Sequence, residues 1–281
     1  MMTAQRAELV SEPKTEAKPI LELQSLTRRF KALTAVDKVN ISVKPGEMFG
    51  LVGPNGAGKT TIIKMLTTIL PPTSGNALVA GHDIVKHSAQ VRRVIGYVPQ
   101  LLSADGALTG YENLLIFAKL YHIPRSERQN RIHDALEFMG LSEFADKMVR
   151  EYSGGMIRRL EVAESMLHRP RLLFLDEPTV GLDPIARKTV WDHIQRLRSD
   201  YGTTILLTTH YMEEADELCD RVAIMHLGKI AAVGTPAELK ASVGEGATLD
   251  DVFVHYSGYE VDSGGNWHEV SSVRRVARRL G

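Results

Sequence analysis

The sequence has little or none of four features: cysteine, excess positive charge, long apolar runs and internal repeats. Its 281 residues contain one cysteine, Cys219, which excludes an internal disulfide framework and fits a reducing compartment. Lys plus Arg and Asp plus Glu number 34 each, so no global positive field attracts nucleic acid, which disfavours nucleic-acid binding except at a local basic patch. No apolar run approaches the roughly twenty residues that cross a bilayer, and no internal repeat is present. We therefore expect a soluble, cytoplasmic protein that reaches a membrane only through a partner.

A glycine-rich loop is the most informative stretch of the chain. Residues 48–52 predict a strand, residues 62–70 predict a helix, and the loop between them has the pattern G-x-x-x-x-G-K-[ST]. Such a loop turns consecutive backbone N–H groups onto a phosphate at a helix N-terminus. Lys59 would reach the β- and γ-phosphates, and the Thr60 hydroxyl would bind Mg²⁺. The alternative is a glycine-rich turn before an ordinary helix, and the flanking strand and helix count against it. The loop consists of Gly53, Pro54, Asn55, Gly56, Ala57, Gly58, Lys59, Thr60 and Thr61.

The order of strands and helices predicts the fold class. Alternating apolar residues between 20 and 45 indicate half-buried strands at the front of the domain. Further along, strands alternate with helices, which is typical of a parallel sheet covered on both faces. Residues 101–170 have helical spacing instead, so we expect a helical subdomain inserted there. The prediction is an α/β P-loop NTPase core with a parallel sheet, an antiparallel β front and this helical insertion. The later strands are expected at 76–80, 94–98, 172–175, 204–208 and 222–225.

Composition divides the chain into three parts. Residues 1–19 mix Glu, Lys, Pro and Ala and lack the apolar core of a signal peptide, which predicts a disordered polar tail. Residues 20–235 would form the nucleotide-binding domain, and residues 236–281 a C-terminal extension. Within the extension we expect a loop at 257–267 and a basic amphipathic helix at 270–280. That helix could contact anionic lipid or a partner, although docking on its own domain or fraying is the simpler alternative.

Two carboxylates follow a strongly apolar strand. Asp176 and Glu177 come directly after Leu-Leu-Phe-Leu, at the strand end where parallel α/β sheets bind ligands. Phosphoryl transfer to water needs Mg²⁺ beside the β- and γ-phosphates and a group that orients the attacking water. We predict that Asp176 holds the metal through its water shell and that Glu177 is the general base. The alternative, a solvated helix cap, is disfavoured by the glycine loop upstream.

Three further positions could serve the same phosphates. Gln100 lies at the end of a predicted strand. His210 ends another, and its imidazole could donate to a γ-phosphate oxygen, although a histidine at a strand end can also be a bystander. Ser153, Gly154 and Gly155 open a predicted helix and form a second potential anion site. If the helical insertion holds this site away from its own glycine loop, its phosphate belongs to another copy of the chain.

The order of these motifs resembles the ATP-binding subunit of an ABC transporter. The resemblance covers about residues 21–236, and its motifs are the glycine loop, Gln100, Ser153-Gly154-Gly155, Asp176-Glu177, Gly181-Leu182-Asp183 and His210. Within that family, the residues in and around these motifs are similar to those of the ABC-2, daunorubicin-resistance-like branch, which consists mostly of exporters. The stretches that carry this finer resemblance are Tyr-Ser-Gly-Gly-Met, Leu-Asp-Glu-Pro-Thr-Val-Gly-Leu-Asp-Pro, Thr-Thr-His-Tyr-Met-Glu-Glu-Ala-Asp and Leu249-Asp250-Asp251-Val252-Phe253.

The resemblance implies roles inside one subunit. Phe30 stands where an aromatic ring stacks on adenine. Gln100 would contact Mg²⁺ and the attacking water, and would couple the site to the membrane subunit. His210 would sense the γ-phosphate. Phe30 replaces the commoner Tyr, which keeps the stacking face and loses a hydroxyl.

The resemblance also implies a dimer. Ser153 and Gly155, with Gly154 between them, would contact the γ-phosphate that is bound by the opposite subunit in a head-to-tail pair. Asp183 would line the dimer seam. The residues flanking the glycines are Tyr152 and Met156, where many relatives have Leu and Gln, which weakens inferences about the flanking contacts.

The expected function is ATP hydrolysis coupled to transport. The chain would act as a homodimer or pseudo-dimer, with ATP and Mg²⁺, on a separate ABC-2-type membrane permease at the inner face of the cell membrane. Efflux of drugs or other small molecules is the expected process, and nucleic acid is not an expected partner. One alternative is a soluble ABC ATPase acting on DNA or ribosomes, but such proteins commonly carry two nucleotide domains or long coiled-coil arms. A P-loop kinase is the other, and it leaves Ser153 and His210 unexplained.

Overall fold

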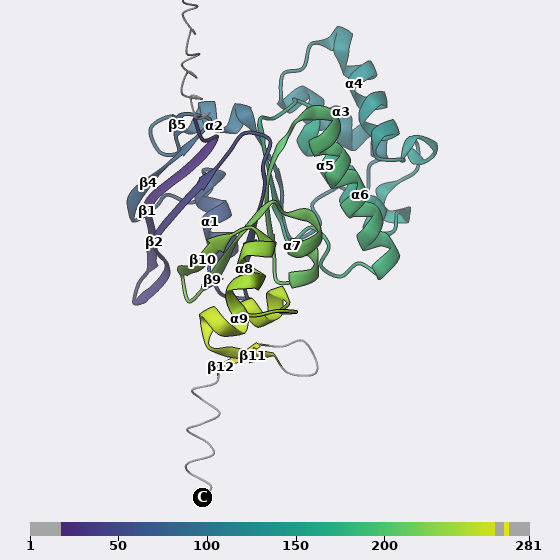
Figure 1. Cartoon of the computed structure of the whole chain (residues 1–281). Helices are drawn as coiled ribbons and strands as arrows, with labels where there is room; N and C mark the ends of the chain where they lie inside the picture. Colours follow the sequence, from purple (N-terminus) through teal and green to yellow (C-terminus); the bar gives the residue numbers. More distant parts are fainter. Residues whose placement is uncertain (1–17, 262–266, 270–281) are drawn as a thin grey trace, which may run out of the picture.

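The computed structural model describes residues 18–261 and 267–269 (Figure 1). Nearly all of the predicted tail, residues 1–17, therefore lies outside the described residues, as does the predicted basic helix at 270–280. In the described part of the chain, no helix combines the length and the apolar character that are needed to cross a membrane.

A six-stranded sheet with the order β10-β9-β3-β8-β7-β6 forms the centre of the molecule. All neighbouring strands pair in parallel except β9 and β10, which are antiparallel. Every residue of β3, β7 and β8 is buried, which explains why β3 and β7 are nearly continuous apolar runs and not alternating ones; β8 also carries three buried threonines. The strands are β3 (Met48–Val52), β6 (Ile95–Val98), β7 (Leu172–Asp176), β8 (Thr204–Thr209), β9 (Arg221–His226) and β10 (Lys229–Gly234).

The register of this sheet aligns the strand ends that carry the predicted site. Val52 pairs with Thr209, Asp176 with Thr208, and Val98 with Leu175. Because these strands are parallel, the chain leaves all four of them at the same edge of the sheet. The glycine loop, the Gln100 loop, the two carboxylates and His210 therefore start side by side.

A second, antiparallel sheet with the order β2-β1-β4-β5 covers one side of the core. Figure 1 shows it in purple and blue, on the side away from the helices α3 to α6. Leu21, Leu23 and Leu26 of its first strand are buried in one apolar cluster with Phe49 of β3 and with Ile62 of α1. The elements are β1 (Leu21–Phe30), β2 (Leu33–Val43), β4 (Ser74–Val79), β5 (His82–Asp83), α1 (Lys59–Leu66) and α2 (Ser88–Val94).

Helices occupy the chain between β6 and β7, as predicted. The first of them begins with a reciprocal cap: Thr109 accepts from the backbone of Glu112, and the Glu112 side chain accepts from the backbone of Thr109. These elements are α3 (Gly110–Leu120), α4 (Arg125–Phe138), the short 3₁₀ helices Ser142–Phe144 and Val149–Glu151, and α5 (Gly154–Met166). After β7 the chain forms α6 (Pro184–Tyr201) and α7 (Met212–Leu218). The predicted fold class is confirmed.

The start of the C-terminal extension packs on the core. It forms α8 (Pro236–Val243) and α9 (Leu249–Ser257), and Leu249, Val252 and Phe253 are buried in the same cluster as Val222 of β9. Their spacing of three and four residues is that of one helix face.

Three local predictions are wrong. The helix predicted at 62–70 is α1, which begins at Lys59 and ends at Leu66, so residues 67–70 lie beyond it. The expected loop at 257–267 instead contains β11 (Tyr259–Val261), which pairs antiparallel with β12 (Trp267–Glu269), and strands of three residues are too short to show a periodic pattern. Val94 ends α2 and does not begin the following strand. Cys219 is buried.

Candidate active site

The glycine loop leaves β3 and delivers Lys59 to the first position of α1. Gly58 adopts φ +111, and a side chain on it would collide with the backbone oxygen of Ala35. Lys59 is 3% exposed, and its ammonium donates to the carbonyls of Gly53 (2.7 Å) and Pro54 (3.1 Å). It also forms an ion pair with Glu177 at 3.1 Å. The loop thus buries a charged group whose partners are its own backbone and the predicted base.

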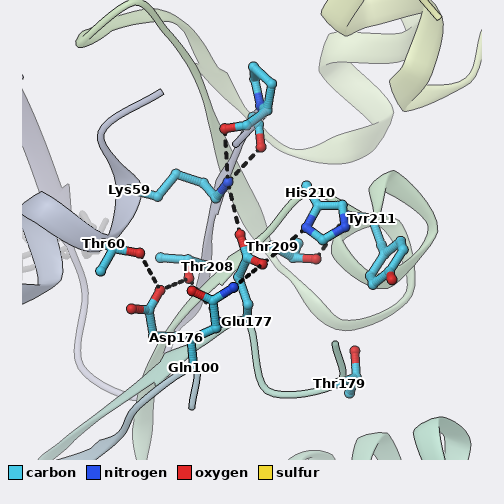
Figure 2. Close-up of polar contacts among 12 residues, drawn as sticks. Lys59, Thr60, Gln100, Asp176, Glu177, Thr179, Thr208, Thr209, His210 and Tyr211 are labelled. Atoms are coloured by element: carbon cyan, nitrogen blue, oxygen red, sulfur yellow. Dashed lines mark hydrogen bonds and ion pairs between the residues drawn. The ribbon is translucent and has the colours of Figure 1, made fainter. Parts of the chain in front are cut away.

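Asp176, at the end of β7, is held by two threonines. Its Oδ1 accepts from Thr208 (2.6 Å) and from Thr60 (3.2 Å), as Figure 2 shows. Its Oδ2 is buried and has no hydrogen-bond partner among the residues that the structure describes. Burial raises the pKa of Asp176, and the hydrogen bonds from the two threonines oppose that shift. A buried carboxylate oxygen without a partner, beside a threonine hydroxyl, is suited to a hydrated cation.

Glu177 lies at the centre of the cluster (Figure 2). Its Oε1 contacts Lys59, and its Oε2 accepts from Gln100 Nε2 at 3.2 Å and from His210 Nδ1 at 3.1 Å. Burial raises the pKa of Glu177, but the hydrogen bond from His210 and the charge of Lys59 outweigh it and lower that pKa overall. The carboxylate is therefore ionised at neutral pH, and His210 must carry its proton on Nδ1.

The backbone of Glu177 is held in the left-handed region. Its φ is +49, which is uncommon for a residue with a side chain and costs roughly 1 kcal/mol or more. The amide donates to the backbone oxygen of Thr208 (3.0 Å) and to its hydroxyl (3.0 Å). This sharp turn directs the carboxylate back toward Lys59.

Sequence reasoning missed Thr208 and Glu214. The Thr208 hydroxyl bridges the Asp176 carboxylate and the Glu177 amide. Glu214 of α7 is fully buried, and its Oε1 accepts from Thr179 and from Trp191, both at 2.8 Å. The available signals were a threonine inside an apolar strand and a carboxylate on the apolar face of a short helix.

The remaining predicted residues lie outside this cluster. Ser153 caps α5, and its hydroxyl accepts from the backbone N–H of Met156. Asp183 caps α6, and Pro184 occupies its first helical position. A side chain on Gly155 would meet Ala186 of α6 at 3.0 Å, so the starts of the two helices adjoin.

No contact among the described residues joins Ser153, Gly154 or Gly155 to Lys59 or Glu177. Phe30, at the end of β1, is 41% exposed, and the guanidinium of Arg28 lies 4.6 Å from its ring centre. The ring is thus available to a further partner on its open side.

Residues 36–180 match the family model described as ABC transporter. The chain belongs to the ABC transporter family. It is 44% identical over 230 residues to the daunorubicin/doxorubicin resistance ATP-binding protein DrrA of Streptomyces peucetius, covering 82% of this chain and 69% of that protein. It is also 44% identical over 221 residues to the Nod factor export ATP-binding protein I of Ralstonia nicotianae, covering 79% and 68%.

Solved structures of ABC ATPases share the fold. One ATP-binding subunit of an ABC transporter is 30% identical, with a TM-score of 0.75 and coverage of 84% of this chain and 99% of that one. An ATP-binding cassette of an ABC transporter in its ADP conformation is 26% identical, with a TM-score of 0.71 and coverage of 84% and 98%. The protein is thus an ABC ATPase subunit that hydrolyses ATP.

Proposed function

We propose that this ABC ATPase drives the export of drugs or related small molecules through a separate ABC-2-type permease. One relative is named for daunorubicin/doxorubicin resistance and another for Nod factor export, and these names support the proposed direction and class of cargo. The observation that carries the catalytic part of the proposal is the position of Glu177 between Lys59, Gln100 and His210.

In this structure, Lys59 and Glu177 neutralise one another. When ATP enters the glycine loop, its β- and γ-phosphates compete for the ammonium of Lys59. Glu177 is then released to accept a proton from the water that attacks the γ-phosphorus, and the bond to the leaving β-phosphate oxygen breaks. His210 and Gln100, which both contact Glu177 Oε2, orient the base and the γ-phosphate end of the site.

Mg²⁺ fits the residues at the end of β7. Thr60 would ligate it through a hydroxyl lone pair while donating its proton to Asp176, as it already does at 3.2 Å. Asp176 would hold the water shell through its unpartnered Oδ2, and Gln100 would complete the site. Bound there, the ion would neutralise charge on the β- and γ-phosphates.

ATP binding would involve two subunits. The backbone of loop residues 53–61 would cradle the phosphates from one side, and Phe30 would stack on adenine. The Ser153-Gly154-Gly155 segment of the other copy would approach the γ-phosphate, with Asp183 at the seam. Among the described residues no contact joins Ser153 to Lys59 or Glu177 of the same chain, which supports this head-to-tail arrangement. The protein would lie on the cytoplasmic face of the membrane, bound to its permease.

The decisive test is Glu177→Gln, with Glu213→Gln as a matched control because Glu213 is exposed on α7. ATP hydrolysis should fall by about 10²–10⁴-fold in Glu177→Gln and stay unchanged in the control. Size-exclusion chromatography with light scattering should show an ATP-bound dimer accumulating only in Glu177→Gln. Hydrolysis near the wild-type rate would remove Glu177 from the role of base.

A second experiment addresses the partner. The chain, co-expressed with a candidate permease, should be retained with it in detergent, and the permease should raise the ATPase rate. Retention of nucleic acid in place of a membrane protein would contradict the proposed transport function.

A further inference from the structure

A buried ion pair on α5 lies outside every motif discussed so far. Arg158 and Glu161 are each 2% exposed, and Arg158 Nη1 lies 2.9 Å from Glu161 Oε2. Removing two charges from water is costly, and an apolar pair of similar volume would commonly stabilise the fold as well. General stability is therefore a weak reason for this pair, and its contacts point to another one.

Both side chains hold the loop that follows β6. Arg158 donates from Nη1 to the backbone oxygen of Pro99 at 2.6 Å and from Nη2 to that of Gln100 at 2.7 Å. Glu161 Oε1 accepts from the backbone N–H of Ser103, and from its hydroxyl at 3.1 Å. One turn of α5 thus holds the 99–103 loop by hydrogen bonds at the beginning and at the end of the loop.

The guanidinium suits this task because its N–H groups form a rigid fork. Two successive carbonyls can be held together in one orientation, which a lysine ammonium, as a flexible point charge, does not impose. Gln100 itself is exposed, its side chain donates to Glu177 over 3.2 Å, and its backbone carbonyl is held by Arg158 Nη2. The orientation of the Gln100 side chain therefore depends on the two carbonyls that Arg158 binds.

We propose that Arg158 and Glu161 are positioning residues for ATP hydrolysis, which hold the 99–103 loop so that Gln100 meets Glu177. Neither residue touches the nucleotide in this scheme. They act only through Gln100, and the inference rests on the proposed role of Glu177 as base. Substituting the pair should therefore slow the chemical step and leave ATP binding by the glycine loop intact.

The test combines Arg158→Met/Glu161→Met, which removes both charges at similar volume, with Gln100→Ala. In the wild-type background the pair substitution should lower kcat by about 10–100-fold while KM for ATP changes by less than about twofold. In the Gln100→Ala background the same substitution should lower kcat by less than about twofold, because contacting residues that act as one unit are not additive. A purely structural role predicts additive losses instead.

Arg159→Met is the matched control. Arg159 is the neighbouring residue, and its Nη1 binds the carbonyl of Met139 at 2.7 Å, away from the 99–103 loop. The kcat of Arg159→Met should equal that of the wild type. Arg158→Lys is the second variant if the double substitution does not fold: it keeps the charge beside Glu161 and should still lower kcat, with no further loss in Gln100→Ala.

Additive losses, an unchanged kcat in Arg158→Lys, or a wild-type kcat in Gln100→Ala would each overturn the proposal. These outcomes are distinct from a failure of the base assignment, which appears as residual hydrolysis in Glu177→Gln.

Discussion

Thr208→Val isolates the function of a single hydroxyl in the site. Thr208 is fully buried at the end of β8, and valine keeps its shape while removing the group that donates to Asp176 (2.6 Å) and accepts from the Glu177 amide. The Glu177 amide retains its bond to the backbone oxygen of Thr208. The substitution therefore removes mainly the charge-assisted hydrogen bond to Asp176.

The magnitude follows from that bond. A hydrogen bond to a charged group contributes about 1.5–3 kcal/mol, so the free energy of unfolding should fall by that amount and the Tm by about 4–10 °C. If Asp176 holds Mg²⁺ as proposed, the Mg²⁺ concentration for half-maximal ATPase activity should rise about 10–100-fold, since groups that orient a metal ligand have effects of this size.

The pH dependence gives an independent reading. Burial raises the pKa of Asp176 and the Thr208 hydrogen bond opposes this, so its removal raises the pKa further. ATPase activity should be lost at a higher pH in Thr208→Val than in the wild type when the pH is lowered.

Thr204→Val is the matched control, because Thr204 is 1% exposed on the same strand and accepts from Gly46 N at 2.9 Å, at the opposite end. It should lower the free energy of unfolding by only about 0.5–1.5 kcal/mol and leave the Mg²⁺ dependence unchanged. Wild-type Mg²⁺ and pH profiles in Thr208→Val would refute the reasoning.

Two further predictions concern buried carboxylates. Burial and the neighbouring Glu161 raise the pKa of Glu164 from 4.5 to about 8, so the folded protein binds more protons than the unfolded chain between these values and loses stability as the pH rises. Glu164→Gln should flatten that loss, measured as the difference in Tm between pH 5.5 and 8.5, and an identical difference in both proteins would contradict it. Glu214→Leu leaves the buried Thr179 hydroxyl and the partly buried Trp191 N–H without this acceptor, at roughly 1–3 kcal/mol for the buried group and less for the other. Glu214→Gln keeps an acceptor there, so urea denaturation should find it clearly more stable than Glu214→Leu, and equal stabilities would count against the bonds.

The sequence predicted the parts of the site that depend on local chain geometry. The glycine loop and the apolar strand before Asp176 each combine a residue type with a backbone conformation, and both occur as expected. The register of the parallel strands then brings these local signals together.

Contacts between distant segments could not be predicted in this way. Thr208 and Asp176 are adjacent only because β7 and β8 pair in one particular register, and a threonine in a strand has many unremarkable explanations. Likewise, Arg158 and Glu161 have the spacing of an ordinary exposed helix pair, and only the packing of α5 against the 99–103 loop shows that both are buried. The roles of such residues can be inferred only when their burial and contacts are known.

The Lys59–Glu177 ion pair would make hydrolysis depend on bound nucleotide. Both side chains are almost completely buried, and Lys59 Nζ lies 3.1 Å from Glu177 Oε1. Separating them without a replacement partner would therefore leave two uncompensated charges. In the proposed mechanism, the phosphates of ATP would replace Glu177 beside Lys59, and Gln100 and His210 would continue to hold the released carboxylate. We expect the base to become free only when the phosphates have taken Lys59, which couples occupancy of the glycine loop to activation of the water.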